Sequence, residues 1–235
     1  MALQLDHIEA RSGTFALTAD LTVDAGARVA IIGASGSGKS TLLDVIAGFL
    51  PVQSGALRWK GRDITRLSPA ERPVSILFQD TNLFPHLTIG QNLALALNPA
   101  TGRMRDGDAA RIDGSLARVG LAGFAERRLS EMSGGQQSRA AFARVLLQGR
   151  PVLLLDEPFA ALGPSLKAEM LDLVSEVAEA EGLTVLLVSH DPQDARRFAE
   201  QTIVVEEGRV SAPEATGHLL DNPPPGLRAY LGGAG

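Results

Sequence analysis

Several features that define other classes of protein are absent from this sequence. The chain has no cysteine, which excludes disulfides and thiolate metal sites. It has no run of about 18 apolar residues, and its first ten residues lack the basic start and apolar stretch of a signal peptide, so we expect neither a membrane span nor export. Basic residues are scattered and the net charge is −5, so we expect no direct binding to nucleic acid.

Length and pattern indicate the fold class. The chain has 235 residues, of which 45% are apolar, enough for one large core or two modest ones in a soluble globular protein. Short β-rich runs alternate with helical patterns, which predicts a layered α/β fold. The apolar runs at 29–32, 152–155 and 185–188 predict buried parallel strands, whereas alternating runs near the start predict an antiparallel sheet. The predicted strands cover residues 3–10, 15–23, 28–33, 56–61, 74–79, 151–157, 184–190 and 202–210.

The region from about residue 85 to 132 contains helical patterns in place of strand patterns. We therefore predict a single domain over residues 1–235, in which a helical subdomain is inserted between strands of the sheet. A further amphipathic helix follows Gly163, with Pro164 at its first position. Prolines near the end predict a loose C-terminal tail. The predicted parts are a sheet core of residues 1–84 and 150–212, the helical subdomain of 85–149 and the tail of 213–235.

A phosphate-binding loop is the strongest motif. An apolar strand is followed by G-x-x-x-x-G-K-S and then by a helical pattern, which is the context this loop requires. Its glycines let backbone N–H groups converge on phosphate oxygens, and the helix N-terminus adds its positive dipole. We expect Lys39 to reach the β- and γ-phosphates from the solvent side and the Ser40 hydroxyl to bind Mg²⁺. One of only three lysines, against nineteen arginines, stands at this position, which argues against a chance match. The predicted loop comprises Gly33, Ala34, Ser35, Gly36, Ser37, Gly38, Lys39, Ser40 and Thr41.

Polar residues end three further predicted strands. Asp156 suits a direct or water-mediated ligand of Mg²⁺, and the adjacent Glu157 suits a base that orients an attacking water. Gln79 and His190 also follow strands, so both should emerge at the same sheet edge as the phosphate loop. There the amide can touch Mg²⁺ or its water, and the imidazole can donate to the γ-phosphate. Taken singly, a structural glutamine and a core histidine are the more common interpretations.

A second turn with the composition of an anion-binding site comprises Ser133, Gly134, Gly135 and Gln136. A helix cap explains the serine and the glutamine, because each side chain can bond the backbone of the other residue. The cap does not explain two glycines, which cost helix stability unless the backbone must approach something closely. A glycine-rich helix start is also an anion site, so we predict that this turn faces a phosphate group.

The phosphate loop, Gln79, the Ser133–Gln136 turn, the run LLLDEP and His190, in this order, resemble the ATP-binding-cassette ATPases, in which SGGQ is the signature. The resemblance implies a P-loop NTPase with a RecA-like mixed sheet core, an N-terminal antiparallel β subdomain and an inserted α-helical subdomain. It implies ATP and Mg²⁺ as cofactors and a homodimer in which each signature turn closes on the γ-phosphate held by the other copy. Phe15 is the only aromatic residue near the first hairpin that the resemblance offers for adenine stacking.

Residues 46–57, 72–99 and 152–166 are more closely similar to the ATPase subunits of bacterial thiamine importers. This resemblance implies a peripheral protein on the cytoplasmic face of the inner membrane, which hydrolyses ATP to drive uptake of thiamine or its phosphates through a separate permease. A periplasmic substrate-binding protein would be an indirect partner. Residues 80–88 and the helical subdomain would face the permease.

One alternative remains open at this point, and the sequence argues against two others. The same kind of ATPase subunit can drive uptake of another small solute, such as ferric iron, a polyamine or an oxyanion. A soluble non-transport cassette ATPase usually carries long coiled coils or tandem cassettes, for which 235 residues leave no room. A P-loop kinase of small molecules has no use for the signature turn.

One departure from the family pattern concerns the loop after Phe159. Relatives have serine and aspartate where this chain has Ala160 and Gly163. Both polar members are therefore missing, and we predict a slow or weakly cooperative ATPase.

Overall fold

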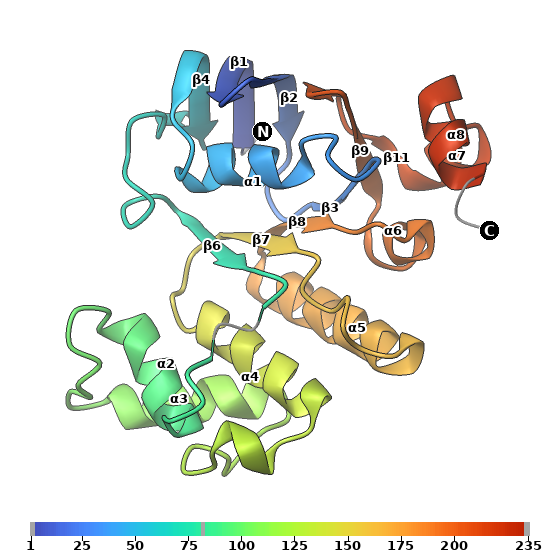
Figure 1. Ribbon diagram of the computed structural model, residues 1–235. Coiled ribbons are helices and arrows are strands. Elements are labelled where there is room, and N and C mark those ends of the chain that lie inside the picture. The colour runs from blue at the N-terminus through green and yellow to red at the C-terminus, as the bar shows by residue number, and fades with distance from the viewer. Residues whose placement is uncertain (1–2, 81–82, 233–235) are drawn as a thin grey trace.

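The computed structural model describes residues 3–80 and 83–232. Within these ranges one mixed sheet of eleven strands runs through the molecule in the order β5-β4-β1-β2-β10-β9-β3-β8-β7-β6, with β11 beside β9 (Figure 1). This confirms the predicted α/β fold. The strands are β1 (Leu3–Ser12), β2 (Phe15–Val23), β3 (Arg28–Ile32), β4 (Val52–Trp59), β5 (Arg62–Asp63), β6 (Val74–Leu77), β7 (Val152–Asp156), β8 (Thr184–Val188), β9 (Gln201–Glu206), β10 (Arg209–Val210) and β11 (Glu214–Ala215).

Strands β1, β2 and β4 form the antiparallel part of the sheet. Along β2, exposed and buried residues alternate from Ala16 to Val23. The alternation arises because one face of this part packs on the core while the other faces solvent. The predicted N-terminal antiparallel part is therefore confirmed.

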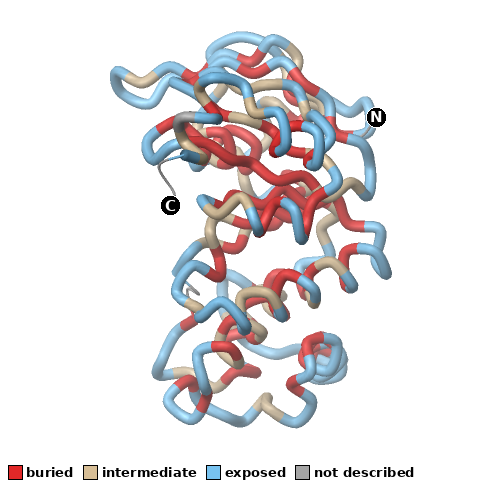
Figure 2. The backbone as a smooth tube through the Cα atoms, turned by 90° about the vertical axis from the view of Figure 1, so that its right-hand side faces the viewer, coloured by how far each residue is buried: buried red, intermediate tan, exposed pale blue. Residues whose placement is uncertain are grey.

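Strands β3, β6, β7, β8 and β9 pair in parallel and carry the core on both faces. In β3, Val29 and Ile31 belong to one cluster of buried residues, and Ala30 and Ile32 belong to the other. Successive side chains of a strand point to opposite faces, so each apolar strand serves two cores. Buried residues accordingly run along these central strands (Figure 2).

The prediction of one long strand over residues 202–210 is wrong. The chain turns at Glu207 and Gly208, which have φ of 47° and 79°, and the hairpin returns as β10. Left-handed φ at both turn residues is the conformation that tight hairpins favour. A Cβ at Gly208 would lie 2.0 Å from the carbonyl oxygen of Ala16, so only glycine fits there. The hairpin places β10 parallel to β2 and thereby joins the antiparallel and parallel parts.

Helices cover the parallel part of the sheet. Helices α2, α3 and α4 lie together at one end, away from β1, β2 and β4 (Figure 1), which confirms the inserted helical subdomain. The residue bounds proposed for the parts remain a prediction. Helix α5 begins at Pro164, as predicted.

No helix in the described ranges combines the length and apolar character needed to cross a bilayer. The helices are α1 (Lys39–Ala47), α2 (Ile89–Leu97), α3 (Asp108–Arg118), α4 (Gly134–Leu146), α5 (Pro164–Glu181), α6 (Pro192–Phe198), α7 (Thr216–Asp221) and α8 (Pro225–Gly232), with a 3₁₀ turn at Leu129–Glu131.

The prediction of a loose tail over residues 221–235 is also wrong for the part that the structure describes, because Pro225–Gly232 form α8 and Leu227 is buried. Just before this stretch, β11 and α7 continue the fold, with Leu219 and Leu220 buried. Their apolar side chains give these short helices a face that packs on the rest of the molecule. Pro225 starts α8, because a proline at the first helical position lacks only an N–H that would have no partner there.

Candidate nucleotide site

The phosphate loop connects β3 to α1, as its motif predicts. Gly33 and Gly38 have φ of 153° and 113°, which L side chains rarely adopt. A Cβ at Gly33 would lie 2.2 Å from the carbonyl oxygen of Val205, and a Cβ at Gly38 would lie 2.9 Å from the Phe15 ring. Both glycines are therefore also required by close approach of β9 and β2. At both glycines the loop therefore lies directly against the sheet.

Lys39 is buried, with 8% of its surface exposed, which corrects the expectation of a solvent-side lysine. Its ammonium group donates to the carbonyl oxygens of Gly33 at 2.8 Å and Ala34 at 2.9 Å. Burial lowers the pKa of this lysine, while the nearby carboxylates of Glu157 and Asp156 act in the opposite direction. The side chain also lines the cavity above the loop, where its charge faces any anion bound there.

Ser37 provides a test of whether the loop fits a phosphate. Its Oγ is buried and has no hydrogen-bond partner among the described residues. A buried polar atom without a partner costs about 1–3 kcal/mol, so the loop gains from a ligand that bonds this hydroxyl. An unpartnered hydroxyl in a glycine-rich loop at a helix start fits a ligand with phosphate oxygens.

Ser40 and Asp156 come together below the loop. The Ser40 hydroxyl donates to Asp156 Oδ1 at 3.3 Å. Burial raises the pKa of Asp156, as does the charge of Glu157, while the Ser40 hydrogen bond and the Lys39 charge lower it. A carboxylate and a hydroxyl are the hard oxygen donors that Mg²⁺ prefers, so these two residues fit that ion.

Glu157 and His190 also meet, 33 positions apart in the sequence. His190 Nδ1 lies 3.1 Å from Glu157 Oε2. The His190 side chain is 60% exposed, so the interpretation as a core histidine is wrong. Glu157 has a φ of 46°, which is uncommon outside glycine and occurs at functional sites where the surroundings hold the backbone. The motif alone did not predict this conformation.

Gln79 lies differently from the other predicted residues. It is exposed beyond the end of β6, and within the described part of the chain it is not among the residues that line the cavity above the phosphate loop. The predicted permease-facing stretch 80–88 includes residues 81–82, which lie outside the described residues.

The signature turn caps α4, as predicted. The Gln136 N–H donates to Ser133 Oγ at 3.4 Å, and the Ser133 N–H donates to Gln136 Oε1 at 3.0 Å. A Cβ at Gly134 would lie 3.8 Å from Leu162, and one at Gly135 would lie 3.4 Å from Leu166, so neither position is sterically closed to alanine. Contacts within the chain therefore do not explain the two glycines.

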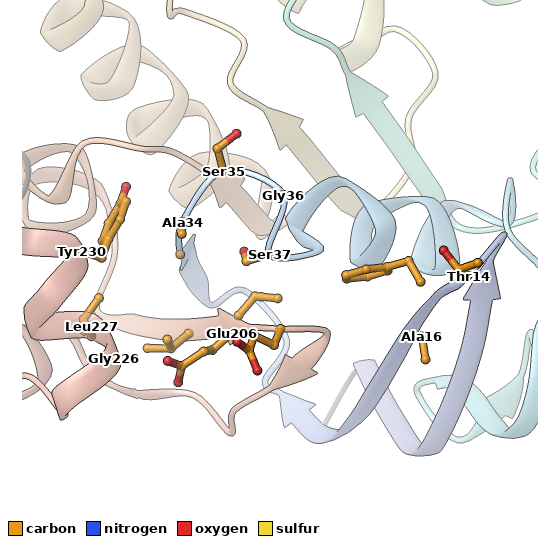
Figure 3. Close-up of a pocket in the computed structure, with 15 residues that line it drawn as sticks. Thr14, Ala16, Ala34, Ser35, Gly36, Ser37, Glu206, Gly226, Leu227 and Tyr230 are labelled. Carbon is orange, nitrogen blue, oxygen red and sulfur yellow. The ribbon is translucent and has the colours of Figure 1, made fainter.

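A cavity of about 880 Å³ lies above the phosphate loop. Phe15, Glu157 and His190 line it with the loop itself, so the structure brings these predicted residues together. A second cavity of about 570 Å³ shares the loop and continues between the β9–β10 hairpin and α8, where Glu206, Leu227 and Tyr230 line it (Figure 3).

Tyr230 lines both cavities, although no motif of the sequence predicted it there. It is the only tyrosine of the chain and follows Leu227 at helical spacing, which was the available signal.

Comparisons with known proteins agree with this geometry. The family model described as ABC transporter matches residues 17–160. The chain is 60% identical to the thiamine import ATP-binding protein ThiQ of Cereibacter sphaeroides, over 98% of this chain and 99% of that one. It is 55% identical to ThiQ of a Ruegeria species, over the same shares.

Solved structures show the same fold. An ATP-binding cassette of an ABC transporter, MJ1267, matches with a TM-score of 0.86 at 25% identity, covering 97% of this chain and 98% of that one. The ATP-binding cassette MJ0796, in a dimeric post-hydrolysis state with bound ADP and Pi, matches with a TM-score of 0.76 at 29% identity, covering 91% and 98%.

Proposed function

The chain belongs to the ABC transporter family of ATP-binding proteins, and from this premise we propose that it is the ATP-hydrolysing subunit of a bacterial thiamine importer. The observation that carries the proposal is the 60% identity to a thiamine import ATP-binding protein over almost the whole of both chains. The geometry of the site supports the chemistry, because the phosphate loop, the acidic strand end and His190 surround one cavity.

The phosphate loop and Lys39 would hold the phosphates of ATP. Backbone N–H groups of the loop and the start of α1 supply positive electrostatic potential, and the Lys39 ammonium adds a full charge from beneath. Ser40 and Asp156 would hold Mg²⁺, with Gln79, beyond the end of β6, as a further oxygen donor. Bound Mg²⁺ neutralises charge on the phosphate oxygens.

Glu157 would act as the base for hydrolysis. It accepts a proton from a water whose oxygen attacks the γ-phosphorus while the bond to the β-phosphate oxygen breaks. The contact to His190 orients the carboxylate, and the other side of the imidazole is free to face the γ-phosphate. Phe15 lies against Gly38 and borders both cavities, and its ring would contact the adenosine part of ATP.

The proposal includes a second copy of the chain and a permease. Ser133, Gly134, Gly135 and Gln136 would close on the γ-phosphate held by the other copy, which accounts for glycines that contacts within one chain do not require. The helical subdomain would contact permease subunits at the cytoplasmic face of the inner membrane, and a periplasmic binding protein would deliver the solute. Specificity for the solute would then lie outside this chain.

Reconstitution with the permease tests the solute. In proteoliposomes that contain this chain and its cognate permease, thiamine-loaded binding protein should raise ATP hydrolysis several-fold above the rate with unloaded binding protein. If a binding protein loaded with iron or a polyamine stimulates hydrolysis and the thiamine-loaded one does not, the assignment as an importer ATPase stands and the assignment of thiamine as the solute is overturned.

A further inference from the structure

Helix α8 borders the candidate nucleotide site and packs on the rest of the molecule there. Leu227, in its first turn, is 2% exposed and belongs to the core cluster that contains α5 and α6. The carboxylate of Glu206, at the end of β9, lies against the backbone of Gly226. Negative charge near a helix start is favourable because the dipole is positive there. The start of α8 is thus held on β9.

Tyr230 holds the next turn of α8 on a different element. Its hydroxyl donates to the carbonyl oxygen of His190, 40 positions earlier in the chain. Figure 3 shows Tyr230 and Ser35 bordering the same pocket, with Leu227 and Gly226 below. Burial raises the pKa of this phenol, as do the charges of Glu157 and Asp191, so the hydroxyl remains protonated and donates. The only tyrosine of the chain therefore contacts the backbone of the residue that touches Glu157.

The residues on both sides of His190 are also held. Ser189 donates to Asp194, and Asp191 accepts from Lys167 at 3.0 Å. The Asp191 N–H donates to Ser189 Oγ at 3.0 Å, and the Tyr230 hydroxyl donates to the carbonyl of His190 between them. With the main chain in this position, the imidazole lies 3.1 Å from Glu157 Oε2. A side chain 60% exposed has few packing contacts of its own to fix it.

We propose that Tyr230 is a positioning residue for hydrolysis: by bonding the His190 carbonyl, α8 holds the imidazole against Glu157. The inference rests on the proposed function of this site as an ATPase. It assigns a role to the C-terminal helix, whose contact with His190 comes from a part of the chain far from every motif. The ring of Tyr230 forms a wall of the cavity, and its hydroxyl sets the position of the imidazole.

The test compares two variants of the full-length chain that each lose one hydroxyl-to-carbonyl hydrogen bond. Tyr230→Phe removes the bond to His190 and keeps the ring. Ser175→Ala removes the bond from Ser175 Oγ to the Leu171 carbonyl, 2.9 Å long, on the outer part of α5. Three quantities are measured: kcat and KM for MgATP, the melting temperature, and the NMR signal of the His190 ring, which a His190→Gln variant identifies among the four histidines.

For Tyr230→Phe we expect kcat to fall about fivefold, KM to change less than about twofold, and the His190 ring signal to move, because one hydrogen bond is lost without loss of the cavity wall. Ser175→Ala should leave all three near the wild-type values. An unchanged kcat, or a lower kcat with an unmoved ring signal, would overturn the positioning role. Absence of hydrolysis in the wild-type chain would overturn the proposed function, whereas equal hydrolysis in wild type and Tyr230→Phe would overturn only the role of Tyr230.

Discussion

Lys39 combines two properties: it carries a positive charge toward the cavity, and it is buried under the phosphate loop. We predict that Lys39→Ala lowers ATP turnover below a tenth of the wild-type rate, a barrier increase of more than about 1.4 kcal/mol, because among the described residues Lys39 is the lysine that lines the cavity above the phosphate loop. The melting temperature should change little, since the variant loses two hydrogen bonds to Gly33 and Ala34 but also removes the cost of burying a charge. Lys60→Ala, at an exposed lysine, is the control for turnover and melting. Turnover above a tenth of wild type would contradict the assignment.

Helix α5 begins at a residue that supplies no side-chain cap. Gly163 has extended backbone angles, φ −64° and ψ 159°, and a Cβ there would meet nothing within 4 Å. We predict that Gly163→Asp fits this position and changes the melting temperature by only a few degrees, because aspartate caps a helix only a few tenths of a kcal/mol better than glycine. If the missing carboxylate explains slow or weakly cooperative hydrolysis, this variant, alone or with Ala160→Ser, raises turnover or the Hill coefficient in the permease complex. Unchanged kinetics would show that the departure at this loop is neutral.

Helices α5 and α6 are joined by an ion pair whose strength depends on pH. Lys167, 18% exposed, lies 3.0 Å from Asp191 and 2.9 Å from Asp194. We predict that Lys167→Met lowers the free energy of unfolding by about 1–2 kcal/mol at pH 7, since charged hydrogen bonds are lost at a partly exposed site. Urea denaturation at a series of pH values measures this difference.

The same experiment tests the direction of the pH dependence. Burial of Asp191 opposes its ionisation, but the Gln193 N–H and the Lys167 ammonium outweigh burial and lower its pKa below 3.8. The stability from this carboxylate is therefore complete above its ordinary pKa and is lost as the pH falls through the lowered value. The difference between wild type and Lys167→Met should shrink in that acid range. A difference that stays constant down to pH 3 would show that packing, and not charge, joins the two helices.

Two copies of the chain, brought together by ATP, would complete each site with the other copy's signature turn. We predict that Glu157→Gln, which keeps the shape of the side chain and removes its basicity, accumulates an ATP-dependent dimer in size-exclusion chromatography. Adding Ser133→Arg should abolish that dimer, because the exposed turn then carries a long side chain where the partner's γ-phosphate must fit. Ser54→Arg, at an exposed position of β4, is the matched control and should leave the dimer intact.

Folding must be checked in these variants, since loss of the Ser133 cap costs about 1 kcal/mol. The melting temperatures should therefore show that every variant is folded at the temperature of the chromatography. A Glu157→Gln chain that stays monomeric with ATP would contradict the role of the signature turn across the dimer.

The sequence by itself determined the features that local pattern encodes. Apolar and alternating runs predicted the parallel and antiparallel strands, because side chains alternate between the two faces of a sheet. The spacing of glycines and Lys39 predicted the loop between β3 and α1, and polar residues that end buried strands predicted that Asp156 and Glu157 lie at the same sheet edge.

Only the tertiary structure decided the features that depend on residues far apart in the chain. The burial of Lys39 depends on the atoms that surround it, which its own motif does not specify. The β9–β10 hairpin turns at Gly208, where β10 pairs with β2 and the carbonyl oxygen of Ala16 leaves no room for a side chain. Helix α8 folds because the core accepts Leu227, and this docking brings Tyr230 to the carbonyl of His190. A contact across 40 positions has no local pattern, so packing alone places it.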